Sequence, residues 1–167
     1  MLLRELACLC SGKPTIPFGF GLSFSTFEYK IVSAPSAVSL APVRDMLAAN
    51  VDRAIPKAED NAPHAEYVVH VTNTGTIDAD DVVLGLLKPP GAGSGGIPLQ
   101  TLFGFERVHV KAGATVEVHL GATMLDFAHV GEDGKFAETE GEYTVQFGIP
   151  ETAEHGMGFA TMKTAAL

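Results

Sequence analysis

The sequence predicts an all-β fold, an antiparallel β-sandwich of about seven strands with one short helix in an insertion between the first two strands. Three observations lead to this prediction. Several runs alternate strictly between apolar and polar residues, turn signals rich in Gly, Asn and Pro separate the runs, and their number and spacing are typical of a sandwich. With 167 residues, 46% of them hydrophobic, the chain is long enough for one domain with its own core.

The N-terminal part of the chain predicts two strands separated by a long insertion. Residues 24–33 form the first strand, because positions 27, 29 and 31 are apolar and alternate with polar residues. The insertion, residues 34–63, contains a short helix that opens at Pro42 and ends near residue 50. Residues 66–72 form the second strand, with positions 67, 69 and 71 inward, and this strand stops at an Asn-Thr-Gly turn.

In residues 80–87, apolar residues occupy both odd-numbered and even-numbered positions, unlike in the other predicted strands. This pattern is typical of a central strand that is covered on both faces, or of one whose outer face meets another domain. We therefore expect an interdomain contact at Val83 and Leu87, or at their neighbours of the opposite parity, together with Phe18 and Phe20. A large exposed apolar patch would mark that contact.

Residues 98–120 predict a hairpin at the centre of the fold. Its first strand ends at a Lys-Ala-Gly turn over residues 111–113, and its second strand places Val116, Val118 and Leu120 on one side. An isolated hairpin is marginal in water, so we expect other strands to cover its apolar face.

The C-terminal part predicts two further strands. Residues 122–139 hold an apolar patch and an acidic Gly turn, and apolar positions 143, 145, 147 and 149 then alternate with polar ones. Tyr143 is placed like the tyrosine of immunoglobulin-like sandwiches whose hydroxyl bonds to upstream backbone. Residues 157–164 would form the final strand.

The charge of the chain argues against a nucleic-acid partner. Its 20 Asp and Glu residues against 11 Lys and Arg give a formal charge of −9, whereas nucleic-acid binding needs clustered basic surface. No apolar run approaches the roughly 20 residues that cross a bilayer, so no membrane partner is expected. Arg4 and Glu5 interrupt the apolar start, unlike a signal peptide, and the location stays open. Cys8 and Cys10 are interpreted as free thiols.

No pattern in the sequence names a catalytic, cofactor-binding or metal-binding residue. The Gly-rich stretch 91–96 lacks the Lys and the helix that follow a phosphate loop, so it predicts a flexible loop. His70 and His119 face solvent on neighbouring strands, but no third ligand is placed by spacing to complete a zinc site. Three acidic clusters fall in turns or on wet strand faces, where solvated charge is the ordinary state.

Four segments, in order, resemble one protein family. They are PFGFGLSFSTFEYK at residues 17–30, VTNTGTIDADDVVLGLL at 71–87, PLQTLFGFERVHVKAGATVEVHL at 98–120 and EGEYTVQFG at 140–148. Together they resemble the C-terminal fibronectin type III-like domain of glycoside hydrolase family 3, the β-glucosidases and β-xylosidases. The third segment and the loop before it are more similar to the β-xylosidases. Glu140 stands where the family commonly has Pro.

The resemblance implies a fibronectin type III-like sandwich over residues 22–167, with residues 1–21 as a connector or a remnant of a preceding domain. It also implies structural roles for Phe105 and Arg107 of the hairpin motif and for Tyr143.

The resemblance further implies that the catalytic machinery lies elsewhere. In this family the nucleophilic Asp lies in an N-terminal (β/α)8 barrel and the acid/base in the α/β domain that follows, yet only 16 residues precede the first matched segment. We therefore expect a chain that is not an enzyme by itself and needs no cofactor. Its expected role is to stabilise its partners, the catalytic domains of a glycosidase for β-linked xylosides or glucosides.

Two other readings remain open from the sequence. One is a stand-alone carbohydrate-binding module, which the absence of Trp and the inward parity of most Phe and Tyr residues disfavour. The other is an interaction module that pairs with another protein through an edge strand, which the fold permits but no residue specifies.

Overall fold

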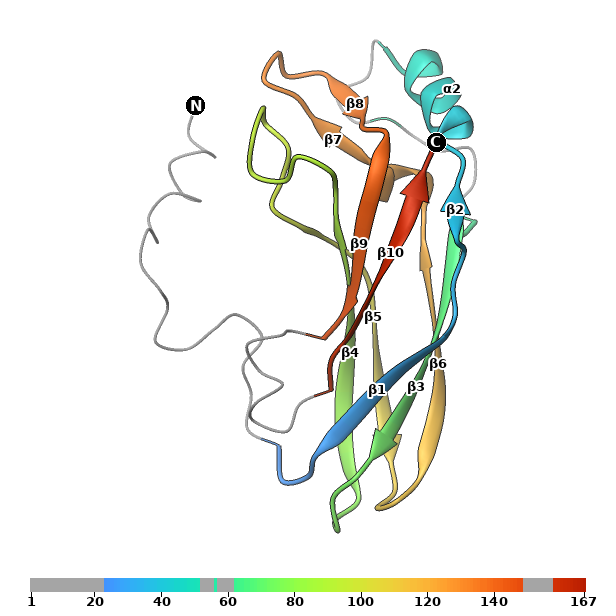
Figure 1. Cartoon of the computed structure of the whole chain (residues 1–167), viewed down its shortest axis with the longest axis vertical. Coiled ribbons are helices and arrows are strands. Elements are labelled where there is room, and N and C mark those ends of the chain that lie inside the picture. Colours follow the sequence, from blue (N-terminus) through green and yellow to red (C-terminus); the bar gives the residue numbers. More distant parts are fainter. Residues whose placement is uncertain (1–22, 52–55, 57–61, 149–157) are drawn as a thin grey trace.

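The computed structural model describes residues 23–51, 56, 62–148 and 158–167, and shows two β-sheets packed face to face (Figure 1). This arrangement confirms the predicted all-β sandwich. The smaller sheet has three antiparallel strands in the order β1-β3-β6. These strands are β1 (Phe27–Ser33), β3 (Ala65–Asn73) and β6 (Thr115–Ala122).

The larger sheet has five strands in the order β2-β10-β9-β4-β5. Its members are β2 (Ala37–Val38), β4 (Ala79–Lys88), β5 (Thr101–Val110), β9 (Gly141–Phe147) and β10 (Ala160–Ala166). All pairs are antiparallel except the short parallel pair of β10 with β2. Seven strands of the two sheets are at least seven residues long, in agreement with the predicted number.

One end of the sandwich is covered by short elements (Figure 1). They are the predicted helix α2 (Ala41–Ala49), the 3-10 turn η1 (Met124–Phe127) and a hairpin of β7 (Ala128–Val130) and β8 (Phe136–Glu138), which the sequence did not predict. The helix buries Val43 and Met46. Its Arg44 donates from Nε to Glu138 on β8 at 2.7 Å and also bonds Glu140, so charge pairs fasten the helix to the hairpin.

The core lies between the two sheets and is filled by alternate residues of each strand. Tyr67, Val69 and Val71 of β3 are fully buried, as the alternation predicted. The Tyr67 ring lies 5.5 Å from that of Phe103 and 5.9 Å from that of Phe147, centroid to centroid. These tilted and edge-to-face contacts join the two sheets through aromatic packing.

Asn73 anchors the opposite end of the sandwich. The Ser25 hydroxyl and the Gly75 backbone amide donate to its Oδ1 at 2.5 and 3.0 Å. Its Nδ2 donates to the carbonyls of Ile77 and Val110 at 2.8 and 2.9 Å. The side chain is fully buried and makes four hydrogen bonds, so it links the start of β1, the turn after β3 and the end of β5.

The hairpin expected over residues 98–120 is not formed. β5 pairs with β4 in the larger sheet, whereas β6 pairs with β3 in the smaller one. The turn at residues 111–113 is present, with Gly113 at a φ of +73°, but it carries the chain across from one sheet to the other. The two strands therefore cover the core from opposite sides.

The expectation that Val83 and Leu87 lie on an outer face is wrong. Both point into the core of the sandwich and are 0% and 1% exposed. β4 is a central strand between β9 and β5, as its apolar pattern predicted, but the residues of the opposite parity form its outer face. Phe18, Phe20 and the predicted connector 1–21 lie outside the described residues.

β5 is an edge strand of the larger sheet, at the end opposite β2. In the register of β5 with β4, Glu106 lies opposite Val83, which points into the core. The Glu106 side chain is therefore on the core side of β5, but it is exposed to solvent at the edge of the sandwich. A charged residue at such a position is typical of edge strands.

Candidate interdomain surface

The outer face of β4 and β5 carries a group of apolar side chains that we name the β4–β5 patch. Its members are Val82, Leu84, Leu102 and Phe105. Phe105 is 65% exposed, Leu102 50% and Val82 41%, whereas Leu84 is half-buried. β4 and β5 run side by side along the sandwich (Figure 1). The patch therefore extends over two neighbouring strands.

The register of the two strands creates this patch. Leu84 lies opposite Phe105, and residues directly opposite each other in an antiparallel pair share a face. Gly85 pairs with Gly104 and Leu86 with Leu102, so Phe103 is the extra residue of a β-bulge in β5, and it turns into the core while Phe105 turns outward. Gly85 makes room for the Phe103 ring, because a Cβ at this position would lie 2.6 Å from its Cζ.

A charged group borders the patch on the same face. The Asp80 carboxylate accepts hydrogen bonds from Nη2 of Arg107 and from Nδ1 of His109, both at 2.6 Å. His109 and then Arg107 hold the pKa of Asp80 below its ordinary value. Arg107 lies opposite Val82 and His109 lies opposite Asp80. The polar group of Asp80, Arg107 and His109 therefore lies next to the apolar side chains on the outer face of the two strands.

Two of the three residues expected to have structural roles lie outside this domain's own core. Phe105 is 65% exposed, and the side chain of Arg107 is 72% exposed. The sequence pattern could not reveal this, because Phe103 and Phe105 have the same parity and only the bulge separates their directions.

Tyr143 is buried as expected and packs against Phe127, with ring centroids 5.5 Å apart. Burial raises the pKa of its hydroxyl, and the backbone of Thr139, four residues upstream, opposes this effect. The approach falls short of a hydrogen bond, and among the described residues the hydroxyl has no partner. The predicted corner hydrogen bond is therefore not formed.

The predicted solvent-facing histidines lie on the outer face of the smaller sheet. His70 and His119 each approach one oxygen of Glu117, at 3.2 and 2.9 Å. His119 and then His70 lower the pKa of this carboxyl. The sequence does not reveal Glu117 as their common partner, because this arrangement depends on the register of β3 with β6. Within the described ranges, no group of three or more His, Cys, Asp or Glu residues is arranged to hold a metal ion.

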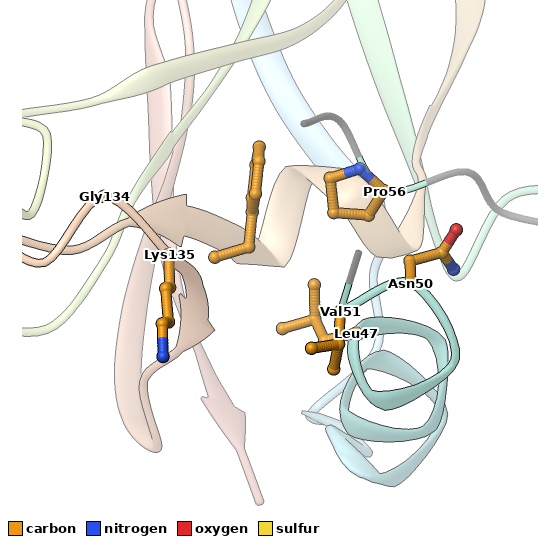
Figure 2. Close-up of a pocket in the computed structure, with 7 residues that line it drawn as sticks. Leu47, Asn50, Val51, Pro56, Gly134 and Lys135 are labelled. Atoms are coloured by element: carbon orange, nitrogen blue, oxygen red, sulfur yellow. The ribbon is translucent and has the colours of Figure 1, made fainter. Parts of the chain in front are cut away.

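A pocket of about 170 Å³ lies between the end of α2 and the turn of the β7–β8 hairpin. Figure 2 shows Leu47 and Val51 on the helix side and Lys135 across from them, with Pro56 on a further wall. Ligand pockets usually occupy roughly 300 to 1,000 Å³, so this pocket is small for a ligand site.

The Gly-rich stretch forms a loop, as predicted. Four of its glycines have φ between +59° and +85°, a region that favours Gly, and the loop closes on itself with a hydrogen bond from the Gly93 amide to the Ile97 carbonyl. In the described part of the chain, no helix combines the length and the apolar character needed to cross a membrane.

Comparison with known proteins identifies the domain. A model described as a fibronectin type III-like domain matches residues 81–149. A probable exo-1,4-beta-xylosidase of Aspergillus clavatus is 36% identical over 141 residues, and beta-D-xylosidase 1 of Arabidopsis thaliana is 32% identical over 148 residues. These matches cover 83% and 82% of this chain but 18% and 19% of the relatives. The chain thus spans about a fifth of the length of the curated relatives it matches.

Solved structures share the same fold. A beta-glucosidase from Listeria innocua matches with a TM-score of 0.67 at 21% identity, over 92% of this chain and 18% of the other. A GH3 beta-glucosidase from Bifidobacterium adolescentis matches with a TM-score of 0.57 at 27% identity, over 89% and 18%. The chain therefore belongs to the fibronectin type III-like domains of glycoside hydrolase family 3.

Proposed function

We propose that residues 22–167 form a non-catalytic accessory domain that stabilises a glycosidase of this family. The observation that carries the proposal is the extent of the match. The chain aligns over most of its length, yet with about a fifth of each β-xylosidase, the part that resembles a fibronectin type III-like domain. The remaining four fifths of such a protein would contain the catalytic domains, which are the partners of this domain.

The relatives favour β-linked xylosides as the substrate class of the complete enzyme. The curated relatives with 32% and 36% identity are named as β-xylosidases, whereas the solved β-glucosidases are 21% and 27% identical. β-Linked glucosides are the second substrate class.

A role as a stand-alone carbohydrate-binding module has less support. Such modules commonly stack sugar rings on exposed aromatic side chains. All three tyrosines of the chain, Tyr29, Tyr67 and Tyr143, are buried, and the chain has no Trp. On the β4–β5 patch Phe105 is the one aromatic residue, so the patch offers no row of rings.

The mass of the native product tests the proposal. An antibody against this domain should detect a product several times larger than 17.5 kDa in source material. The isolated chain should not hydrolyse a chromogenic β-xyloside or β-glucoside. A native product of 17.5 kDa, or hydrolysis by the pure chain, would overturn the accessory role.

A further inference from the structure

We propose that the β4–β5 patch is the surface through which this domain packs against the rest of its glycosidase, with Phe105 as the central anchor. This inference rests on the proposed function and adds the location and chemistry of the contact.

The side chains of the patch are exposed to solvent. Phe105, Leu102 and Val82 are between 41% and 65% exposed although they occupy two long strands of a well-formed sheet. Large apolar side chains that gather on one face, next to polar residues, mark interaction sites. Phe105 is the largest of them and lies opposite Leu84, so a partner would bury an aromatic anchor together with its aliphatic neighbours.

The polar border of the patch also fits an interface. An interface typically has an apolar centre and a polar rim, and Arg is enriched in it. The Arg107 side chain is 72% exposed, and among the described residues only its Nη2 is engaged, by Asp80, so its other donors face solvent in this part of the structure. The matching surface would have an apolar hollow for Phe105 and a hydrogen-bond acceptor or carboxylate beside it.

The outer face of the smaller sheet differs from the β4–β5 patch. The outer side of the smaller sheet is mainly charged or polar, and water solvates such groups better than an interface does. The residues that give it this character are Glu28, Lys30, Glu66, His70, Thr72, Glu117 and His119.

The partner that covers the patch would be the rest of the same polypeptide. The relatives contain about four fifths of a chain beyond the part that this domain matches, which supplies a covalently linked surface of sufficient size. Phe105 and Arg107 belong to the segment that resembles the family, yet neither is used in this domain's core. A linked domain that covers them explains why both are present.

Site-specific thiol labelling tests this proposal. Phe105→Cys and Leu102→Cys place reporters in the patch, and the second variant keeps the anchor. His119→Cys is the matched control, because His119 is 70% exposed on the opposite face. Peptide mass spectrometry follows the maleimide reaction at each position, both in the 167-residue chain and in the longer native protein with the same substitutions.

We expect all three reporters to react rapidly in the 167-residue chain. In the longer protein, both patch reporters should react at least about tenfold more slowly, because an interface excludes water from its anchors, while His119→Cys reacts at its former rate.

Each other outcome overturns the inference. Equal rates at the patch in both proteins would refute the docking surface while the accessory role stands. Protection of His119→Cys alone would assign the contact to the other sheet. Patch labelling that slows as the concentration of the 167-residue chain rises would assign the patch to a second copy. A native product of 17.5 kDa would remove the linked partner and the accessory role with it.

Discussion

The Tyr29 hydroxyl donates a hydrogen bond of 2.7 Å to the Asp81 carboxylate across the core of the sandwich. Tyr29 belongs to the smaller sheet and Asp81 to the larger one, and both are buried. The other Asp81 oxygen accepts the Val82 amide at 2.9 Å. Burial raises the pKa of Tyr29 far above its ordinary value, so its hydroxyl keeps the proton that it donates. The pair is therefore a polar link between two otherwise apolar surfaces.

Because of Asp81, we expect the free energy of unfolding to fall as the pH rises from acid to neutral. Burial raises the pKa of Asp81, and the hydrogen bonds from Tyr29 and Val82 only partly offset this. A raised pKa means that the folded protein holds the proton more tightly than the unfolded chain. This stabilisation is complete below the pKa of unfolded Asp and is lost as the pH rises through the folded pKa. Asp81→Asn should remove this dependence.

Denaturant unfolding of both proteins between acid and neutral pH measures this effect. The free energy of unfolding of the wild type, relative to Asp81→Asn, should fall as the pH rises. Asp80→Asn is the control with the opposite sign, because His109 and Arg107 lower the pKa of Asp80. Asp80 contributes stability above the pKa of unfolded Asp and loses it as the pH falls through its folded pKa. Parallel pH curves for the wild type and Asp81→Asn would contradict the prediction.

Asn73→Ala should be among the most damaging single changes in the described chain. The substitution leaves buried groups of Ser25 and Val110, and part-buried groups of Gly75 and Ile77, without their partner. We expect the free energy of unfolding to fall by about 3 kcal/mol, because unsatisfied buried polar groups are costly. Urea unfolding measures this change.

Thr26→Ala is the control for Asn73→Ala. It removes an exposed bond of 2.8 Å between the Thr26 and Thr74 hydroxyls, and its effect should stay below about 1 kcal/mol. Equal losses for the two variants would show that the Asn73 network does not hold this end of the sandwich together.

Gly85→Ala should destabilise the fold, whereas Gly104→Ala should not. A Cβ at position 85 would meet the Phe103 ring at 2.6 Å, and that ring is held between Tyr67 and Phe147. We expect a loss of about 1–3 kcal/mol from this overpacking. Gly104 lies opposite Gly85 on β5, and a Cβ there would have its nearest neighbour at 3.5 Å, an ordinary contact.

Thermal unfolding of the two glycine variants gives the comparison. A similar midpoint for Gly85→Ala and the wild type would mean that Phe103 moves aside at no cost, and that the bulge does not depend on this glycine.

Tyr143→Phe should leave the stability unchanged or raise it by up to about 1 kcal/mol, because the hydroxyl is buried and has no partner among the described residues. Tyr29→Phe is the contrasting variant. It removes a bond to a buried carboxylate, and the free energy of unfolding should fall by about 1–3 kcal/mol. Chemical denaturation of both variants decides the matter, since a loss of 1 kcal/mol or more in Tyr143→Phe would reveal a bonded hydroxyl.

The sequence predicted those features that depend on one strand at a time. Alternation reports directly which side chains are buried, so the inward residues of β1, β3 and β9 were predicted correctly. The helix α2 was also predicted, because Pro42 marks its first turn.

Features that depend on pairing between distant strands were not accessible from the sequence. Adjacent strands joined by a tight turn favour a hairpin, yet β5 and β6 belong to different sheets because each pairs with a strand earlier in the chain. The inward direction of Phe103, opposite to that of Phe105, depends on the bulge in β5 across from Gly85 and Leu86, and the position of Glu117 between two histidines depends on register. Arg44 and Glu138 meet across 94 positions of the chain.

Glu106 bears on how this domain behaves when it is concentrated. A strand from another molecule that paired with β5 would extend the larger sheet. It would cover the Glu106 side chain, which lies on the core side of β5 and is now exposed to solvent. Removing that carboxylate from water without a positive partner is unfavourable. Glu106 therefore disfavours the addition of strands to β5, the longest edge strand of the sandwich, and with it the growth of fibrils. It does so even though the outer face of β4 and β5 carries apolar side chains.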